Sequence, residues 1–463
     1  MYRPRENLCS WSAFALLLWT LNGCQSYRPQ PIDVEQIQRD WHDRDARGVS
    51  ATLKDMLATK VPAGFDLGNG VSLREAQAVL LFFNPSLRVL RQQTRLPAVA
   101  AEYAAEWRDP DLELDGSQIL ANVSDRLLWG GTLGITIPLS GRPALAQRLA
   151  NSQAIEAEAA LLGAEWALLK ELQLEWTHYS ALVAEIALIE QALADLEPLV
   201  EASARFKAAQ AMTVLEERLL LLQEAQGQEQ LLAVKAQRTA RRLRVIALLG
   251  LSPQHDWQLQ PEMPATADRP TLTAVADHPR VRAALAAYTV AEQSVELEIR
   301  RQYPDVRIGL GAGDETGDSR LLFGLDVLPI PIWNRNRGAI ATSIAQRRVA
   351  AAAVEEALLT QQLRITQGHA RVLAAIDRRR FLEERLAPLA NAQLQDARRS
   401  TASGDLNLVL LTDAVERALS ARRELLRARA EEGLATLALQ TAVGPFSVPL
   451  TRATTSDSKK DQP

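Results

Sequence analysis

The sequence predicts a mainly helical protein with four β-strands per chain, built from one unit that occurs twice. Three observations predict this fold class. Apolar residues recur every seven positions over long stretches, four short segments alternate apolar and polar residues, and matching segments recur at an offset of about 194 residues. The chain has 463 residues, of which 47% are hydrophobic and only 5% aromatic. This composition suits thin seams between helices better than thick globular cores.

Composition also excludes several classes of function. The net charge of −4 argues against a basic protein that holds nucleic acid. Only 2 Cys and 5 His are present, so neither a disulfide scaffold nor a Cys/His zinc domain is expected. The acids and histidines show no nucleophile–base pattern and no metal-ligand spacing, and there is no phosphate loop. We therefore expect no catalytic residues, no metal site and no cofactor, and a protein that is not an enzyme.

The N-terminus predicts the compartment. Residues 1–23 carry two arginines and then an apolar run that is too short to span a bilayer, as in a signal peptide. The run ends in Leu-Asn-Gly-Cys (21–24), which resembles a bacterial lipobox and makes Cys24 the predicted lipid attachment point. Gln25 stands where an inner-membrane lipoprotein typically carries Asp, which favours the outer membrane. The alternative is an ordinary secretory signal followed by an incidental cysteine.

Internal duplication sets the organisation of the mature chain. Asn84–Arg88 matches His278–Arg282, and Arg142–Ala150 matches Arg337–Ala345, in the same order and at nearly the same offset. The predicted parts are an N-terminal arm, a first repeat, a linker, a second repeat and a polar tail that we expect to be disordered. Their bounds are residues 24–71, 72–250, 251–270, 271–446 and 447–463.

Each repeat is predicted to contain a helix, two strands, a very long helix and a return helix. In the first repeat, Ser72 and Glu75 have the spacing of a capping box, and the helix they open is predicted to end near Trp107. Strands are predicted around residues 112–115, 132–139, 306–311 and 321–328. Two ordinary soluble hairpins would fit these segments. Alternating segments of about 9–11 residues also match strands that cross an outer membrane. Since four strands cannot close a barrel, several chains would have to pool them.

The long helices are predicted from a heptad seam. In the first repeat the seam residues are Leu169, Leu172, Trp176, Tyr179, Val183, Ile186, Leu193 and Val200. They predict a helix over residues 141–209, about 100 Å long, with a return helix over 213–249. A plain antiparallel coiled coil is the alternative interpretation of this seam, because its helices pack in the same way. Pro198 should kink the long helix or end it early. The second repeat should run from residue 338 to 401, turn at 402–405, and return to about 443.

Taken together, these features resemble the outer-membrane efflux channel family of the TolC type. The resemblance rests on the Asn84-Pro85 and His278-Pro279 helix starts, the paired strands, the mid-helix Pro198 and Pro388, and the turn at Gly404. Residues 328–338 (LPIPIWNRNRG) are similar to the branch that serves heavy-metal RND pumps. The resemblance implies a homotrimer with a trimeric α-barrel in the periplasm and a shared 12-stranded β-barrel in the outer membrane. It implies a passive exit duct, fed by an inner-membrane RND-type pump through a periplasmic adaptor protein.

The resemblance also implies where the functional residues lie. The helix tips that dock the adaptor would contain Ala211, Met212, Thr213, Gly404, Asp405 and Leu406. Acids just past the tips, Glu217 and Asp413, match family positions of a periplasmic gate that attracts cations. A solvated helix face explains each acid equally well. Two other functions remain open at this stage: an exit duct for type I protein secretion, and a non-channel periplasmic coiled-coil lipoprotein.

Overall fold

The computed structural model describes residues 27–57, 65–118, 127–208, 212–263, 275–315, 318–325, 332–402 and 408–444. The chain divides into two compact units, Met1–Arg44 and Asp45–Pro463. The described part of the first unit contains helix α2 (Val34–His42). The predicted signal peptide, Cys24 and the polar tail lie outside the described residues. Among the helices that are described, none has a stretch long and apolar enough to cross a membrane.

The second unit is mainly helical with one small sheet, as the sequence predicts. The first set of elements is α3 (Ala46–Leu57), α4 (Leu73–Phe83), α5 (Pro85–Tyr103), β1 (Asp111–Gln118), β2 (Leu127–Ile137), α6 (Arg142–Ala208) and α7 (Val214–Leu249). The second set is α8 (Pro279–Arg300), β3 (Val306–Glu315), β4 (Asp318–Leu325), α9 (Arg337–Phe381), α10 (Ala387–Ala402) and α11 (Leu408–Val443). From α5 onward the same order of elements occurs twice, except that the long helix of the second set is divided into α9 and α10.

The first predicted helix is wrong in its extent. Ser72 and Glu75 do form the capping box that opens α4. However, α4 ends at Phe83, and α5 begins at Pro85 and ends at Tyr103, before the predicted end. The break lies at Asn84, because a residue that precedes proline is driven out of the α conformation. The Oδ1 atom of Asn84 then caps the new helix by accepting a bond of 3.1 Å from the Leu87 N–H.

Both repeats make the same junction between their first helix and their return helix. The Nδ2 atom of Asn84 donates to the Leu248 carbonyl at 2.8 Å. In the second repeat, His278 Nε2 lies 3.2 Å from the carbonyl of Thr441, which stands at nearly the same sequence offset. His278 Nδ1 accepts from the Arg280 N–H at 3.2 Å, so Nε2 carries the proton and donates to Thr441. Burial lowers the pKa of His278 and favours this neutral form.

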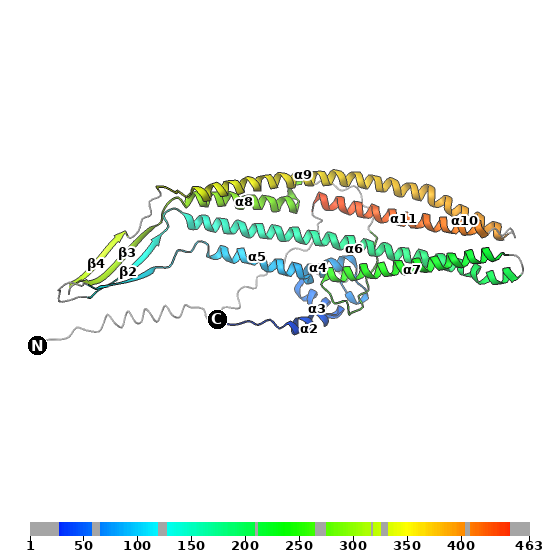
Figure 1. Cartoon of the computed structure of the whole chain (residues 1–463), viewed down its shortest axis with the longest axis horizontal. Coiled ribbons are helices and arrows are strands. Elements are labelled where there is room, and N and C mark those ends of the chain that lie inside the picture. The colour runs from blue at the N-terminus through cyan, green and yellow to red at the C-terminus, as the bar shows by residue number, and fades with distance from the viewer. Residues whose placement is uncertain are drawn as a thin grey trace. The chain divides into compact units, whose positions relative to one another are not determined.

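The long helices follow the predicted seam. Helix α6 covers nearly the whole predicted span, and Pro198 does not end it. Leu172 and Trp176 on the seam are fully buried. Helices α5 and α7 pack along α6 one after the other, as do α8 and α11 along α9 (Figure 1). In the second repeat a π-helical turn, Leu382–Leu386, separates α9 from α10 just before Pro388. Such a turn breaks the regular hydrogen-bond ladder where proline has no N–H to donate.

The four strands form one antiparallel sheet rather than two separate hairpins. The strand order is β1-β2-β3-β4, and the pairing of β2 with β3 joins the two repeats. The strand predicted over 132–139 begins earlier and ends earlier. The one predicted over 321–328 begins earlier, at Asp318, and its last three residues lie outside the described residues. Among the described residues, β1 and β4 are edge strands with a partner on one side only. An edge of this kind presents unpaired backbone groups to another strand.

Candidate functional sites in the sheet and at the helix tips

One face of the sheet is apolar and exposed. The register brings Leu112, Leu133, Leu310 and Phe323 into one row across all four strands. Their exposed fractions are 64%, 47%, 53% and 74%. The next row on this face contains Leu114, Gly131, Ala312 and Leu321. A continuous apolar surface that spans every strand of a sheet marks a contact with another protein or with lipid.

The opposite face of the sheet is polar and rich in glycine. Its rows are Asp111, Gly134, Gly309 and Gly324, then Glu113, Thr132, Gly311 and Leu322. Arg307 forms ion pairs with Asp111 and Glu113 across this face. A side chain at Gly134 would lie 2.5 Å from Arg307 Nε, so glycine leaves the space in which Arg307 reaches Asp111. The sheet therefore separates an apolar surface from a polar one.

The first helix tip is a capped and packed turn. Met212, a predicted tip residue, is buried against Leu196 and Leu220. Thr213, also predicted at the tip, caps α7. Its hydroxyl accepts from the Glu216 N–H at 3.2 Å, and the Glu216 carboxylate accepts from the Thr213 N–H at 2.7 Å. The bond from the Thr213 N–H, together with one of 2.7 Å that the Thr213 hydroxyl donates to the same carboxylate, lowers the pKa of Glu216. The spacing of Thr213 and Glu216 is a capping-box signal that our reading of the sequence missed.

The other predicted tip residues are Ala211, Gly404, Asp405 and Leu406, and all four lie outside the described residues. The predicted gate acids are described, and each has a cation beside it in the same chain. Glu217 on α7 pairs with Lys207 of α6 at 2.6 Å, and Asp413 on α11 pairs with Arg417 at 3.0 Å. Neither acid is an isolated negative charge within one protomer.

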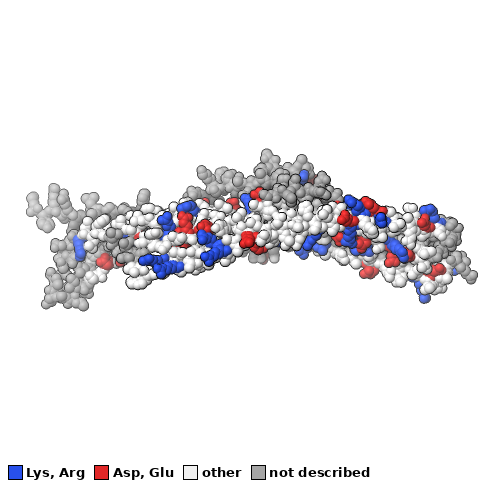
Figure 2. Space-filling model, turned by 90° about the horizontal axis from the view of Figure 1, so that it is seen from above, with Lys and Arg blue, Asp and Glu red and all other residues white. Residues whose placement is uncertain are grey.

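Ion pairs that no sequence pattern indicated join the two repeats along the helices. Glu185 of α6 is buried and accepts from Arg423 of α11 at 2.5 Å and from Arg427 at 3.2 Å. Nearer the tips, Asp195 of α6 pairs with Arg398 of α10 at 2.9 Å. On the face shown in Figure 2, basic and acidic side chains lie next to one another in the same way. The helices are thus cross-linked by pairs whose partners are up to 242 residues apart.

The part of the chain that is described contains no group of three or more His, Cys, Asp and Glu residues that would hold a metal ion. The polar groups described above instead form the polar face of the sheet, the capped first helix tip and the ion pairs between the long helices.

Comparison with known proteins finds a family match in the second repeat. The family model for outer membrane efflux proteins matches residues 273–445, which cover the second repeat from η3 (Val275–Asp277) to the end of α11. The second repeat of the chain is thus similar to outer membrane efflux proteins. This bears out the resemblance that the sequence motifs indicated.

Individual known proteins are also similar to this chain. It is 27% identical to the cobalt-zinc-cadmium resistance protein CzcC of Cupriavidus metallidurans over 151 residues, which cover 32% of this chain and 36% of the relative. Among solved structures, a membrane protein from Pseudomonas aeruginosa is 20% identical, with a TM-score of 0.70 over 80% of this chain and 93% of that one. CusC is 15% identical, with a TM-score of 0.69 over 81% of this chain and 92% of CusC. These structures share the fold.

Proposed function

We propose that this protein is the outer-membrane duct of a tripartite efflux system and that it carries out no chemistry. The sheet is the observation that carries the proposal. Its apolar face suits the hydrocarbon of a bilayer, its polar face suits a water-filled lumen, and its two open edges need further strands. In a homotrimer, β4 of one protomer would pair with β1 of the next, giving a 12-stranded barrel.

The helices extend this duct into the periplasm. In the proposed trimer, the long helices α6 and α9 and the shorter helices packed along them form an α-barrel below the sheet. A lipid on Cys24 would anchor each protomer to the outer membrane, and two or more acyl chains on one cysteine hold firmly. The exposed leucines on α9, such as Leu359, Leu363 and Leu373, would then lie against the next protomer.

We further propose that the substrates are metal cations, delivered by an RND-type pump through a periplasmic adaptor. The support is the likeness to CzcC, whose name describes cobalt, zinc and cadmium resistance, together with the motif at residues 328–338. The adaptor would dock at the helix tips. Because Met212 is buried, the first tip would present the capped turn at Thr213 and its neighbours, rather than the methionine side chain.

Charge substitutions on the two faces of the sheet test the membrane assignment. Leu310→Arg places a charge on the apolar face in the middle of β3 and should cost about 2–4 kcal/mol in each chain if that face meets lipid. We expect the variant to disappear from the outer-membrane fraction. Thr132→Arg, its control on the polar face, should be found there at the wild-type level. Equal outer-membrane amounts of the two variants would contradict the proposed orientation of the sheet.

The proposed gate is tested by neutralising its acids. Three copies of Glu217 and Asp413 around a narrow pore would concentrate negative charge, even though Lys207 and Arg417 offset part of it in each protomer. We expect Glu217→Gln combined with Asp413→Asn to weaken the block of channel current by divalent cations several-fold. If the variant is blocked at the same cation concentration as the wild type, these two acids are not part of the gate.

A further inference from the structure

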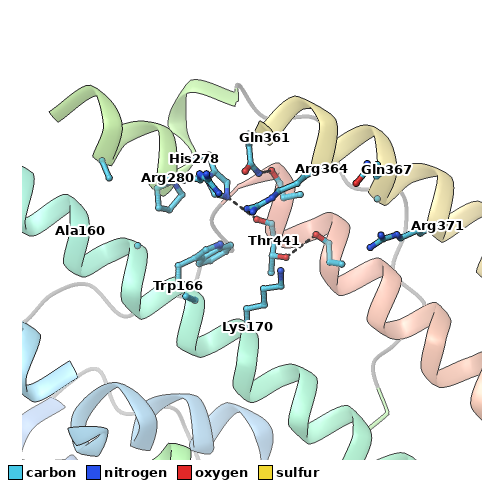
Figure 3. Close-up of a pocket in the computed structure, with 17 residues that line it drawn as sticks. Ala160, Trp166, Lys170, His278, Arg280, Gln361, Arg364, Gln367, Arg371 and Thr441 are labelled. Carbon is cyan, nitrogen blue, oxygen red and sulfur yellow. Dashed lines mark hydrogen bonds between the residues drawn. The ribbon is translucent and has the colours of Figure 1, made fainter. Parts of the chain in front are cut away.

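A basic recess lies between the two repeats, where α8 begins and α11 ends. Its volume is about 630 Å³, and it is lined by residues of α6, α8, α9 and α11. Four cationic side chains surround it: Lys170 from α6, Arg280 from α8, and Arg364 and Arg371 from α9 (Figure 3). No aspartate or glutamate is among the described residues that line it. The recess thus brings together positive charge from three helices.

Most of this charge has no acidic partner among the described residues. Arg280 pairs with Glu356 at 2.9 Å. Within the described part of the chain, no ion pair is formed by Lys170, Arg364 or Arg371. Elsewhere on the same helices arginines are paired, as Arg347 is with Glu292 at 3.1 Å. Burial and then the charge of Arg364 lower the pKa of Lys170, so the two cations lie close enough to repel each other. Such repulsion is relieved when an anion enters.

The floor of the recess is fixed by buried contacts. Gln361 is fully buried and donates through Nε2 to the Ala442 carbonyl, while His278 donates to the Thr441 carbonyl. Both bonds tie the floor to the end of α11. A side chain at Gly368 would meet Leu439 at 3.1 Å, so α9 and α11 approach closely beside the recess. The cations are therefore held around a preformed space rather than on free surface loops.

The start of α8 adds to the positive potential. Pro279 is the first residue of this helix and lines the recess together with the capping residue His278. The N-terminal end of a helix carries a partial positive charge that favours anions. His278 itself stays neutral, because its Nδ1 accepts the Arg280 N–H. The recess therefore combines the N-terminal end of α8 with the ammonium group of Lys170 and with two guanidinium groups, those of Arg364 and Arg371, that have no acidic partner among the described residues.

We propose that this recess binds a dissolved oxyanion of the phosphate class. Guanidinium groups pair with phosphate oxygens through two parallel N–H bonds, and the ammonium of Lys170 supplies a point charge from the facing helix. The volume leaves room for a hydrated phosphate or for a small phosphate ester. A bound anion would link α6 of the first repeat to α9 of the second. This inference does not depend on the channel function, since it concerns equilibrium binding to the folded protein.

Binding of inorganic phosphate to the purified full-length protein tests the proposal. Equilibrium dialysis with labelled phosphate, at constant ionic strength set by chloride, should show one site per chain with a Kd on the order of 1 mM. Arg364→Gln should raise that Kd about tenfold, and Lys170→Gln combined with Arg364→Gln should abolish binding. Arg348→Gln is the matched control. It removes the same charge from an exposed position on α9, sixteen residues away and outside the recess.

Three outcomes overturn the proposal. These are the absence of saturable phosphate binding at 10 times the expected Kd of about 1 mM, an equal loss of binding in Arg348→Gln, and full binding in Arg364→Gln. Circular dichroism of each variant shows that it is folded, and since Arg364 is exposed we expect the helical signal to be unchanged. Loss of binding in folded Arg364→Gln, with binding retained in Arg348→Gln, supports the assigned site.

Discussion

At the scale of single residues, the most consequential charge is Glu185. Its side chain is only 9% exposed, and it faces both Arg423 and Arg427 of the other repeat. A buried carboxylate of this kind is tolerated only because its partners are present. Replacing it leaves the two arginines without the negative charge that balances them. Glu190, five residues further along α6, pairs with Lys235 at 2.8 Å, but both side chains are exposed.

The difference between these two pairs gives a prediction. Glu185→Gln should lower the free energy of unfolding by about 2 kcal/mol, because an internal charge pair is broken. Glu190→Gln should change it by less than about 0.5 kcal/mol, as for other exposed pairs. Denaturant unfolding of the two purified variants and the wild type measures both values. If the two substitutions cost the same, the contact between the repeats at Glu185 is not an important part of the stability.

Pairs of this kind could not be predicted from the sequence. Glu185 and Arg423 stand on helices of different repeats, and nothing local in either segment indicates which distant charge it will meet. The same holds for Lys207 and Glu217, whose pairing depends on how the first hairpin closes. By contrast, the capping box of Ser72 and Glu75 was predictable, because both partners lie within one turn of helix.

At the scale of elements, Asn84 in the first repeat and His278 in the second stand at equivalent helix junctions. The two residues stabilise these junctions with different side-chain chemistry. Each side chain caps a helix and also donates to the last turn of the return helix. Asparagine does so at any pH. Histidine does so only while it is neutral, because a protonated Nδ1 can no longer accept the Arg280 N–H.

This difference predicts a pH dependence. Since the pKa of His278 is lowered in the folded protein, the unfolded chain binds a proton more readily, and stability is lost as the pH falls below the ordinary value of 6.5. The slope for one proton is at most about 1.4 kcal/mol per pH unit. His278→Asn, which places the first-repeat residue in the second repeat, should flatten this part of the profile. Unfolding curves between pH 5 and 7 measure it, and an unchanged slope in the variant would contradict the assignment.

The elements show which sequence signals were decisive. The heptad seam predicted α6 closely, because its apolar residues are buried by neighbouring helices along most of its length. The Asn84-Pro85 helix start was recognised, but the helix opened at Ser72 was still expected to continue across it, because the apolar pattern does. The local effect of Pro85 on the backbone ends that helix. Pro198 was expected to kink α6 or to end it early, and it does not end it, since the helix runs on to Ala208.

At the scale of the whole molecule, duplication explains both the sheet and its open edges. One repeat supplies a single hairpin, which is at best marginally stable alone. Two repeats pair through β2 and β3, and the sheet still ends in two edges. The alternation of residues predicted the two faces of each strand. It could not predict that the hairpins would join into one sheet, because that pairing depends on the long helices that bring them together.

Recording of current across a planar lipid bilayer is the most direct test of the proposed duct function. We expect the purified protein to insert and to give stepwise conductance, and chemical cross-linking to show three chains in each conducting particle. Folded protein that enters the bilayer without conducting, or that conducts as a particle without three chains, would contradict the account.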